Sequence, residues 1–143
     1  MATRSMIGQM QDDQTILAIY CHWDGYPEHN GRLLKDHWTD RAKVKQMLDL
    51  GDMSVLGEEI GKKHHFDDRD GRGNGCAFYG RDRNEDVSNT VYKMASWLEC
   101  EGYMGAEFLY LQGKDGRWSV SEESGSSPVP VAQAIEERAE ALD

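Results

Sequence analysis

The segment ILAIYCHW, residues 16–23, constrains the fold of this chain more strongly than any other stretch. Alternate side chains of a β-strand point to opposite faces of its sheet. One face of this strand would carry Ile16, Ala18, Tyr20 and His22, and the other Leu17, Ile19, Cys21 and Trp23. Because both faces are largely apolar, the segment predicts a strand in the centre of a sheet that is covered on both sides.

The rest of the sequence predicts an α+β fold around this strand. We expect one hairpin formed by residues 6–10 and 16–23 around the turn QDDQ, a short strand over 76–80, and a second hairpin over 106–121 around GKDG. Helices are expected over residues 31–38, 40–50, 52–61, 87–102 and 131–142. The order ββ-ααα-β-α-ββ-α predicts a mainly antiparallel sheet of about five strands with helices packed on it.

The length of 143 residues suits a single domain. Residues 1–121 are expected to form the α+β core of this domain, with a polar loop over residues 62–75. Residues 122–130, which are rich in Ser, Gly and Pro, are expected to be a flexible connector. Residues 131–143 would then form an acidic C-terminal helix that packs on the same domain.

Charge and composition exclude several classes of function. The net charge of −10 argues against direct binding to nucleic acid, whose phosphates would be repelled. No apolar run approaches the roughly 20 residues that span a bilayer, so no membrane association is expected. Three cysteines without regular spacing favour a reducing cytoplasm.

The charge is distributed unevenly along the chain. Residues 119–143 carry six acids against one arginine, whereas residues 61–83 carry six basic residues against four aspartates. The simplest interpretation is a solvated acidic helix and a polar loop. The alternative is a dipolar surface, with an acidic face for a basic protein partner and a basic rim for a small anion.

No motif for catalysis, a metal or a cofactor is present in the sequence. Cys21 and His22 are neighbours on one strand and point to opposite faces, so they can neither share a metal ion nor form a catalytic dyad. The glycine-rich stretch DGRGNG precedes a strand instead of opening a helix, which is not the arrangement of a phosphate-binding loop. The residues therefore favour a binding protein over an enzyme, with no catalytic residues, no metal site and no cofactor.

One stretch, residues 20–31 with the sequence YCHWDGYPEHNG, has the polar variety of a binding site. It leaves the central strand at an end of the sheet, where ligands tend to bind. The candidate ligand-binding residues are His22, Asp24, Tyr26, His29 and Asn30, joined by Arg81 and Asp82 if the strand over 76–80 neighbours the central strand. Arg83 would then lie nearby, and Arg4 is a further candidate. The alternative is purely local structure, in which Asp24 makes a turn and Asn30 caps a helix.

Five strings occur in order over residues 3–120: TRSMI, IYCHWDGYPEHNGRLL, TDRAKV…LGDMSVLG, FYGRDR and LYLQGKDGRWSV. In these strings the chain resembles a family of small proteins encoded by tailed bacteriophages. The resemblance implies a phage accessory protein that acts in the cytoplasm of an infected bacterial host. It supplies no catalytic residues.

Three functions follow from these observations. The first is binding to a host protein, a defence or regulatory factor that the phage protein inhibits or sequesters. The second is binding, with or without hydrolysis, of a small nucleotide-like anion at the rim formed by residues 22–31 and Arg81. The third, a minor virion or assembly component, is less favoured because the chain has no coiled-coil heptads. A homo-oligomer is compatible with each of them.

Overall fold

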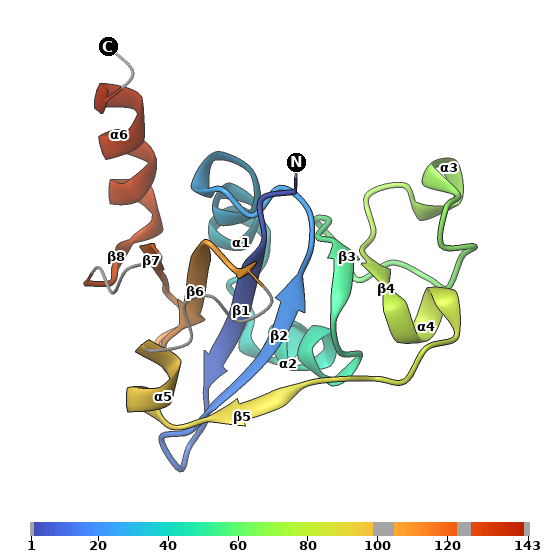
Figure 1. The fold of residues 1–143 in the computed structure, drawn as a ribbon, viewed down its shortest axis with the longest axis horizontal. Helices are drawn as coiled ribbons and strands as arrows, with labels where there is room; N and C mark the ends of the chain where they lie inside the picture. The colour runs from blue at the N-terminus through green and yellow to red at the C-terminus, as the bar shows by residue number, and fades with distance from the viewer. Residues whose placement is uncertain (1, 99–104, 123–126, 142–143) are drawn as a thin grey trace.

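The computed structural model describes residues 2–98, 105–122 and 127–141. Within these ranges, eight strands form one mixed sheet in the order β4-β3-β2-β1-β6-β7-β8, and β5 also pairs with β2 (Figure 1). The strands are β1 (Ser5–Met10), β2 (Ile16–Cys21), β3 (Met53–Val55), β4 (Ala77–Phe78), β5 (Thr90–Tyr92), β6 (Phe108–Gln112), β7 (Trp118–Glu122) and β8 (Val129–Pro130).

The helices are short apart from two. They are α1 (Arg32–His37), α2 (Arg41–Asp49), α3 (Arg69–Arg72), α4 (Tyr79–Arg83), α5 (Met94–Leu98) and α6 (Val131–Ala141), and the π-helical turn η1 (Pro27–Gly31) leads directly into α1. None of the described helices combines the length and the hydropathy that a membrane-spanning segment needs.

The prediction that β2 is a central strand is confirmed. All six of its residues are buried. It pairs along its whole length with β1, while its first half also pairs with β5 and its last residue, Cys21, with β3. The strand therefore has neighbours on both sides and apolar cover on both faces.

The α+β class and both predicted hairpins are also confirmed, but the sheet has more than the expected five strands. The hairpins β1–β2 and β6–β7 are each antiparallel. They join each other through β1 and β6, which run parallel from the pair Ser5–Phe108 onward. A second parallel pair, β2 with β3, makes the sheet mixed.

The prediction of a helix over residues 52–61 was wrong, because this segment begins with β3. The backbone N–H groups of His22 and Trp23 donate to the carbonyl groups of Met53 and Ser54, at 3.1 and 3.0 Å. The apolar spacing that suggested a helix thus belongs to a strand that extends the sheet beyond the end of β2.

The helix expected over residues 87–102 was wrong in its first half. Thr90–Tyr92 forms β5, and helix α5 begins only at Met94; residues 99–102 lie outside the described part of the chain. β-Branched and aromatic side chains suit a strand, and β2 offers them a pairing edge. The strand expected over 76–80 is likewise shorter, because Tyr79 begins helix α4.

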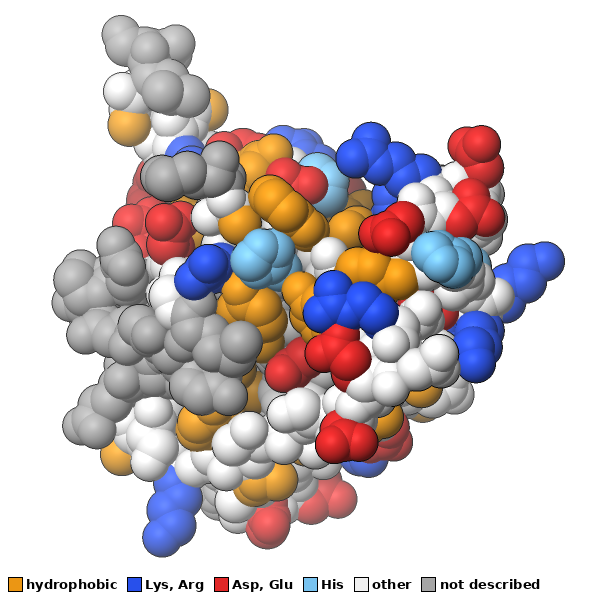
Figure 2. Space-filling model, turned by 45° about the vertical axis from the view of Figure 1, so that its right-hand side comes forward, with side chains coloured by type: hydrophobic (Ala, Val, Ile, Leu, Met, Phe, Trp, Pro, Cys, Tyr) orange, Lys and Arg blue, Asp and Glu red, His pale blue; other side chains and the backbone are white. Residues whose placement is uncertain are grey.

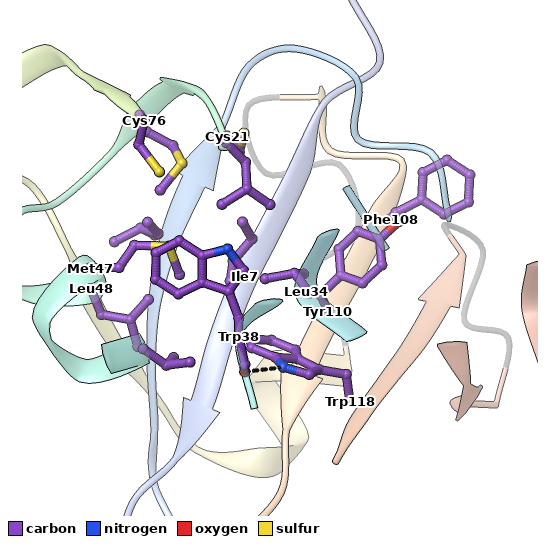
Figure 3. Close-up of a cluster of buried hydrophobic side chains, with 14 of the residues drawn as sticks. Ile7, Cys21, Leu34, Trp38, Met47, Leu48, Cys76, Phe108, Tyr110 and Trp118 are labelled. Atoms are coloured by element: carbon purple, nitrogen blue, oxygen red, sulfur yellow. Dashed lines mark hydrogen bonds between the residues drawn. The ribbon is translucent and has the colours of Figure 1, made fainter. Parts of the chain in front are cut away.

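The larger hydrophobic cluster lies between the sheet and helices α1, α2 and α6, and its centre is Trp38 (Figure 3). This side chain is fully buried, and its indole N–H donates to the carbonyl of Gly57 at 2.9 Å. The Trp38 carbonyl in turn accepts from the indole of Trp118 at 2.8 Å. Helix α6 contributes Val131 and Ala134 to this cluster. The opposite face of the sheet carries a smaller cluster around Tyr20 and Trp97.

Replacing Trp38 by Phe should lower the free energy of unfolding by about 2–4 kcal/mol, because the smaller ring leaves a void and the Gly57 carbonyl loses its buried donor. Urea denaturation followed by circular dichroism measures the loss. The matched control is Trp23→Phe, since Trp23 is 43% exposed, and this change should cost less than about 0.5 kcal/mol. Equal losses in the two variants would contradict the central role of Trp38.

Candidate functional site

A cleft of about 480 Å³ lies beyond the end of β2, on the sheet face that carries Tyr20. We call it the His22 cleft. Its lining residues are Arg4, Tyr20, His22, Asp52, Tyr79, Arg83, Glu85, Asp86 and Ser88. Figure 2 shows a face of the molecule on which histidine, basic and acidic side chains surround hydrophobic ones. The cleft thus combines apolar ring surface with charged groups of both signs.

A hydrogen bond of 2.6 Å joins the Tyr20 hydroxyl to Nδ1 of His22. Burial raises the pKa of Tyr20, so this side chain remains a phenol at neutral pH. Burial and the nearby Arg4 guanidinium lower the pKa of His22, so its imidazole is neutral. When the Tyr20 hydroxyl donates to Nδ1, the ring proton lies on Nε2, and His22 keeps one donor for a ligand.

Asp52 connects the cleft to the sheet. Its carboxylate accepts the backbone N–H of Tyr20 at 2.8 Å, and its own N–H donates to the Ser88 carbonyl at 2.9 Å. Burial raises the pKa of Asp52, although hydrogen bonds from Tyr20 and Ser88 oppose that rise. The Asp52 carbonyl also accepts the N–H of Tyr79 at 3.2 Å. Asp52 therefore holds the segment 79–88 against the end of β2.

Arg83 lies over two aromatic rings. Its guanidinium is 4.6 Å from the ring centre of Phe66 and 4.7 Å from that of Tyr79, and the two rings stack with centres 5.5 Å apart. The same guanidinium forms an ion pair with Glu85. Both partners are about half exposed, so a ligand can reach this pair from solvent.

Of the five candidates predicted between residues 22 and 30, only His22 lines this cleft. Asp24 adopts a left-handed turn with φ of 58°, and its carbonyl accepts the N–H of Asn30. Asn30 is fully buried, and its amide donates to the Trp23 carbonyl at 3.2 Å. Tyr26 packs partly buried against the larger cluster, and His29 lines a different hollow. The turn at Asp24 is thus present, whereas Asn30 does not cap a helix: it lies within η1, and its side chain holds the Trp23 carbonyl.

Arg81 and Asp82 lie away from the cleft lining and hold the chain together. They belong to helix α4, not to the end of a strand as expected. Arg81 donates to the carbonyls of Gly61 and Cys76, at 2.8 and 3.1 Å. The fully buried Asp82 carboxylate accepts N–H groups from Phe78, at 2.8 Å, and from Arg81, at 3.0 Å. Together they fasten the segment after β3 to helix α4.

Five residues of the cleft were not predicted from the sequence. Tyr20 was expected on the same strand face as His22, and Arg4 and Arg83 were considered, but Asp52, Tyr79, Glu85, Asp86 and Ser88 were not. The last four belong to the segment 79–88, which reaches β2 only through tertiary contacts. No local pattern in the sequence predicts such contacts.

Neither described cysteine is an activated nucleophile. Burial raises the pKa of Cys21 to about 12 and that of Cys76 to about 11. In the part of the chain that the structure describes, no three His, Cys, Asp or Glu side chains are grouped to hold a metal ion.

No protein-family model, no curated protein and no solved structure matches this chain.

Replacing Asp82 by Ala should lower the free energy of unfolding by about 3 kcal/mol at pH 7, because Arg81 loses its buried partner. Burial opposes ionisation of Asp82, but the hydrogen bonds from Arg81, Phe78 and His64 outweigh it, so its pKa lies below 3.8. The stabilisation is therefore complete above pH 3.8 and is lost as the pH falls through the lowered pKa. Urea denaturation at pH 7 and pH 3 measures both effects.

The control for this prediction is Asp70→Ala, since Asp70 is an exposed residue of helix α3. It should change the stability at pH 7 by less than about 0.5 kcal/mol. A difference between the Asp82 variant and the unmodified chain that is as large at pH 3 as at pH 7 would show that the carboxylate charge is not what stabilises this contact.

Proposed function

We propose that this protein binds a small ligand with an anionic group in the His22 cleft, and that it does so as a phage accessory protein in an infected bacterium. The observation that carries the proposal is the Tyr20–His22 hydrogen bond of 2.6 Å in a cleft that is also lined by two arginines. The phage context rests on the sequence resemblance alone.

Arg4 and Arg83 supply the positive charge for such a ligand. Hydrogen bonds between a guanidinium and an anionic oxygen are about twice as strong as neutral ones. The neutral imidazole of His22 adds a donor through Nε2, and Tyr79 contributes to the lining beside it. The partly buried Tyr20–His22 pair fixes the imidazole orientation before the ligand arrives, which reduces the entropy lost on binding.

Glu85 competes with the ligand anion for Arg83. Its carboxylate pairs with Arg83, and it therefore occupies the position that a ligand anion would take. An exposed ion pair of this kind contributes at most about 1 kcal/mol, so an incoming anion can displace it. Asp52 and Asp86 remain as acceptors for hydroxyl or amino groups of the same ligand.

Sulfate is a suitable probe because it stays anionic across the working pH range. Titration at pH 7, followed by the NMR signal of the His22 ring, should give a saturable shift. Arg4→Gln should weaken sulfate binding about tenfold, because a hydrogen bond to a charged group is lost. Glu85→Gln should strengthen it about threefold, because a competing carboxylate is removed.

Two matched controls accompany these variants. Arg32→Gln removes an exposed arginine that lines a different hollow, and Glu140→Gln removes an exposed carboxylate on helix α6. Both should leave the sulfate affinity unchanged within about twofold. The proposal fails if the His22 signal does not saturate, or if the controls change the affinity as much as the cleft variants do.

A second candidate function, binding to a host protein, is favoured by three exposed apolar side chains in and beside β5, which we call the β5 patch. Val87, Val91 and Met94 are 56%, 61% and 39% exposed. Within the described residues β5 pairs only with β2, so its other edge is open to a partner strand. The net charge of −10 favours a basic partner.

The double variant Val87→Ser and Val91→Ser tests this candidate. The unmodified chain should retain one specific bacterial protein from a host lysate at low and at moderate salt, and the variant should retain at least about threefold less of it. His22→Asn, which changes the cleft instead, should capture as much as the unmodified chain. The absence of any specific protein at both salt concentrations, or full capture by the double variant, would exclude the β5 patch as a docking surface.

A further inference from the structure

A second hollow, of about 270 Å³, lies on the other side of the aromatic residues that border the His22 cleft. We call it the Trp23 hollow. Its lining includes Trp23, Ser54, Phe66, Asp67, Arg69 and Arg72. These residues belong to the end of β2, to β3 and to the segment around helix α3.

Two pairs of rings separate the hollow from the cleft, and each pair has one member in each. His22 lines the cleft and Trp23 the hollow, and their rings meet edge to face with centres 4.8 Å apart. Tyr79 lines the cleft and Phe66 the hollow, and their rings stack with centres 5.5 Å apart. At these two contacts, a pair of touching rings lies between the two depressions.

Arg83 spans this division. Its guanidinium lies over both members of the second pair, at 4.6 Å from Phe66 and 4.7 Å from Tyr79. A group held by Arg83 is thus within reach of both depressions. A ligand that extends across the ring pairs can keep its anionic group at Arg83 while another part of it enters the hollow.

The chemistry of the Trp23 hollow suits a flat aromatic ring. Trp23 is 43% exposed, whereas Trp38, Trp97 and Trp118 are at most 6% exposed. An indole left open to solvent but held in place by an edge contact offers a rigid stacking surface. Arg69 and Arg72 add guanidinium planes on which a base can also stack, and the exposed Asp67 offers hydrogen-bond acceptors for its amino groups.

From these observations we infer that the cleft and the hollow form one composite site for a nucleotide, with the phosphate between Arg4 and Arg83 and the base against Trp23. The inference rests on the proposed function, because it places the ligand's anionic group in the His22 cleft. Asp52 and Asp86 of the cleft supply acceptors for the ribose hydroxyls, a role that carboxylates commonly have in nucleotide sites. The net charge of −10 favours a mononucleotide or dinucleotide over a long nucleic-acid strand.

The experiment compares three probes on the full chain: inorganic phosphate, adenosine and adenosine monophosphate. Calorimetric titration measures each affinity, and tryptophan emission reports on Trp23, the most exposed of the described tryptophans. Adenosine monophosphate should bind at least about tenfold more tightly than phosphate and should quench the emission as it saturates, because base stacking on an aromatic ring contributes at this level. Phosphate should bind without quenching.

The variant Trp23→Leu should weaken the binding of adenosine monophosphate about tenfold and leave the phosphate affinity unchanged within about twofold. Trp23→Phe, which keeps a ring, should retain most of the affinity. Val91→Ala, an exposed apolar position outside both depressions, is the matched control and should change neither affinity.

The outcomes separate the two proposals. If phosphate binds and adenosine monophosphate binds no more tightly, the composite site is excluded and the anion site of the His22 cleft stands. If Trp23→Leu weakens phosphate as much as the nucleotide, the hollow is not a separate base site and the inference is also excluded. If none of the three probes binds, both the inference and the proposed function are overturned.

Discussion

The complete enclosure of β2 is the constraint on which the rest of this structure depends. All six residues of the strand are buried, and β1, β3 and β5 pair with its edges. Such a strand can expose polar groups only where it ends. The first residues after it, His22 and Trp23, line two different depressions although their rings are in contact. The end of one buried strand therefore borders two neighbouring hollows.

Polar side chains near this strand end mainly hold the backbone. Asn30 donates to the Trp23 carbonyl, Asp52 accepts the Tyr20 N–H, and the Asp82 carboxylate accepts the Phe78 N–H. Each of these contacts pairs a backbone group that would be costly to bury alone. The high polar content that suggested a binding site at residues 20–31 is therefore shared between structural support and ligand-accessible groups. His22 belongs to the second kind.

The sequence predicted those features that depend on local alternation or on turns. The two faces of residues 16–23 and the turns QDDQ and GKDG identified β2 and both hairpins. Met53–Val55 and Thr90–Tyr92 were wrongly expected to be helical, because a short apolar run fits either periodicity and only the open edges of β2 favour strands. His22 was placed by alternation alone. Arg81 and Asp82 were misplaced because helix α4, which directs their side chains inward, starts where a strand was expected.

The sign of the ligand charge depends on local geometry more than on the net charge of −10. At physiological ionic strength, charges separated by more than about 8 Å in solvent are largely screened. The exposed acids of helix α6, which Figure 1 shows at the opposite side of the sheet from helix α4, therefore act weakly on the His22 cleft. The acids that matter are the three that line the cleft, Asp52, Glu85 and Asp86, and of these Glu85 pairs with Arg83. An anion that takes the place of the Glu85 carboxylate at Arg83 makes the interaction that this carboxylate made, so binding depends on how readily Glu85 turns away and not on the net charge of the whole chain.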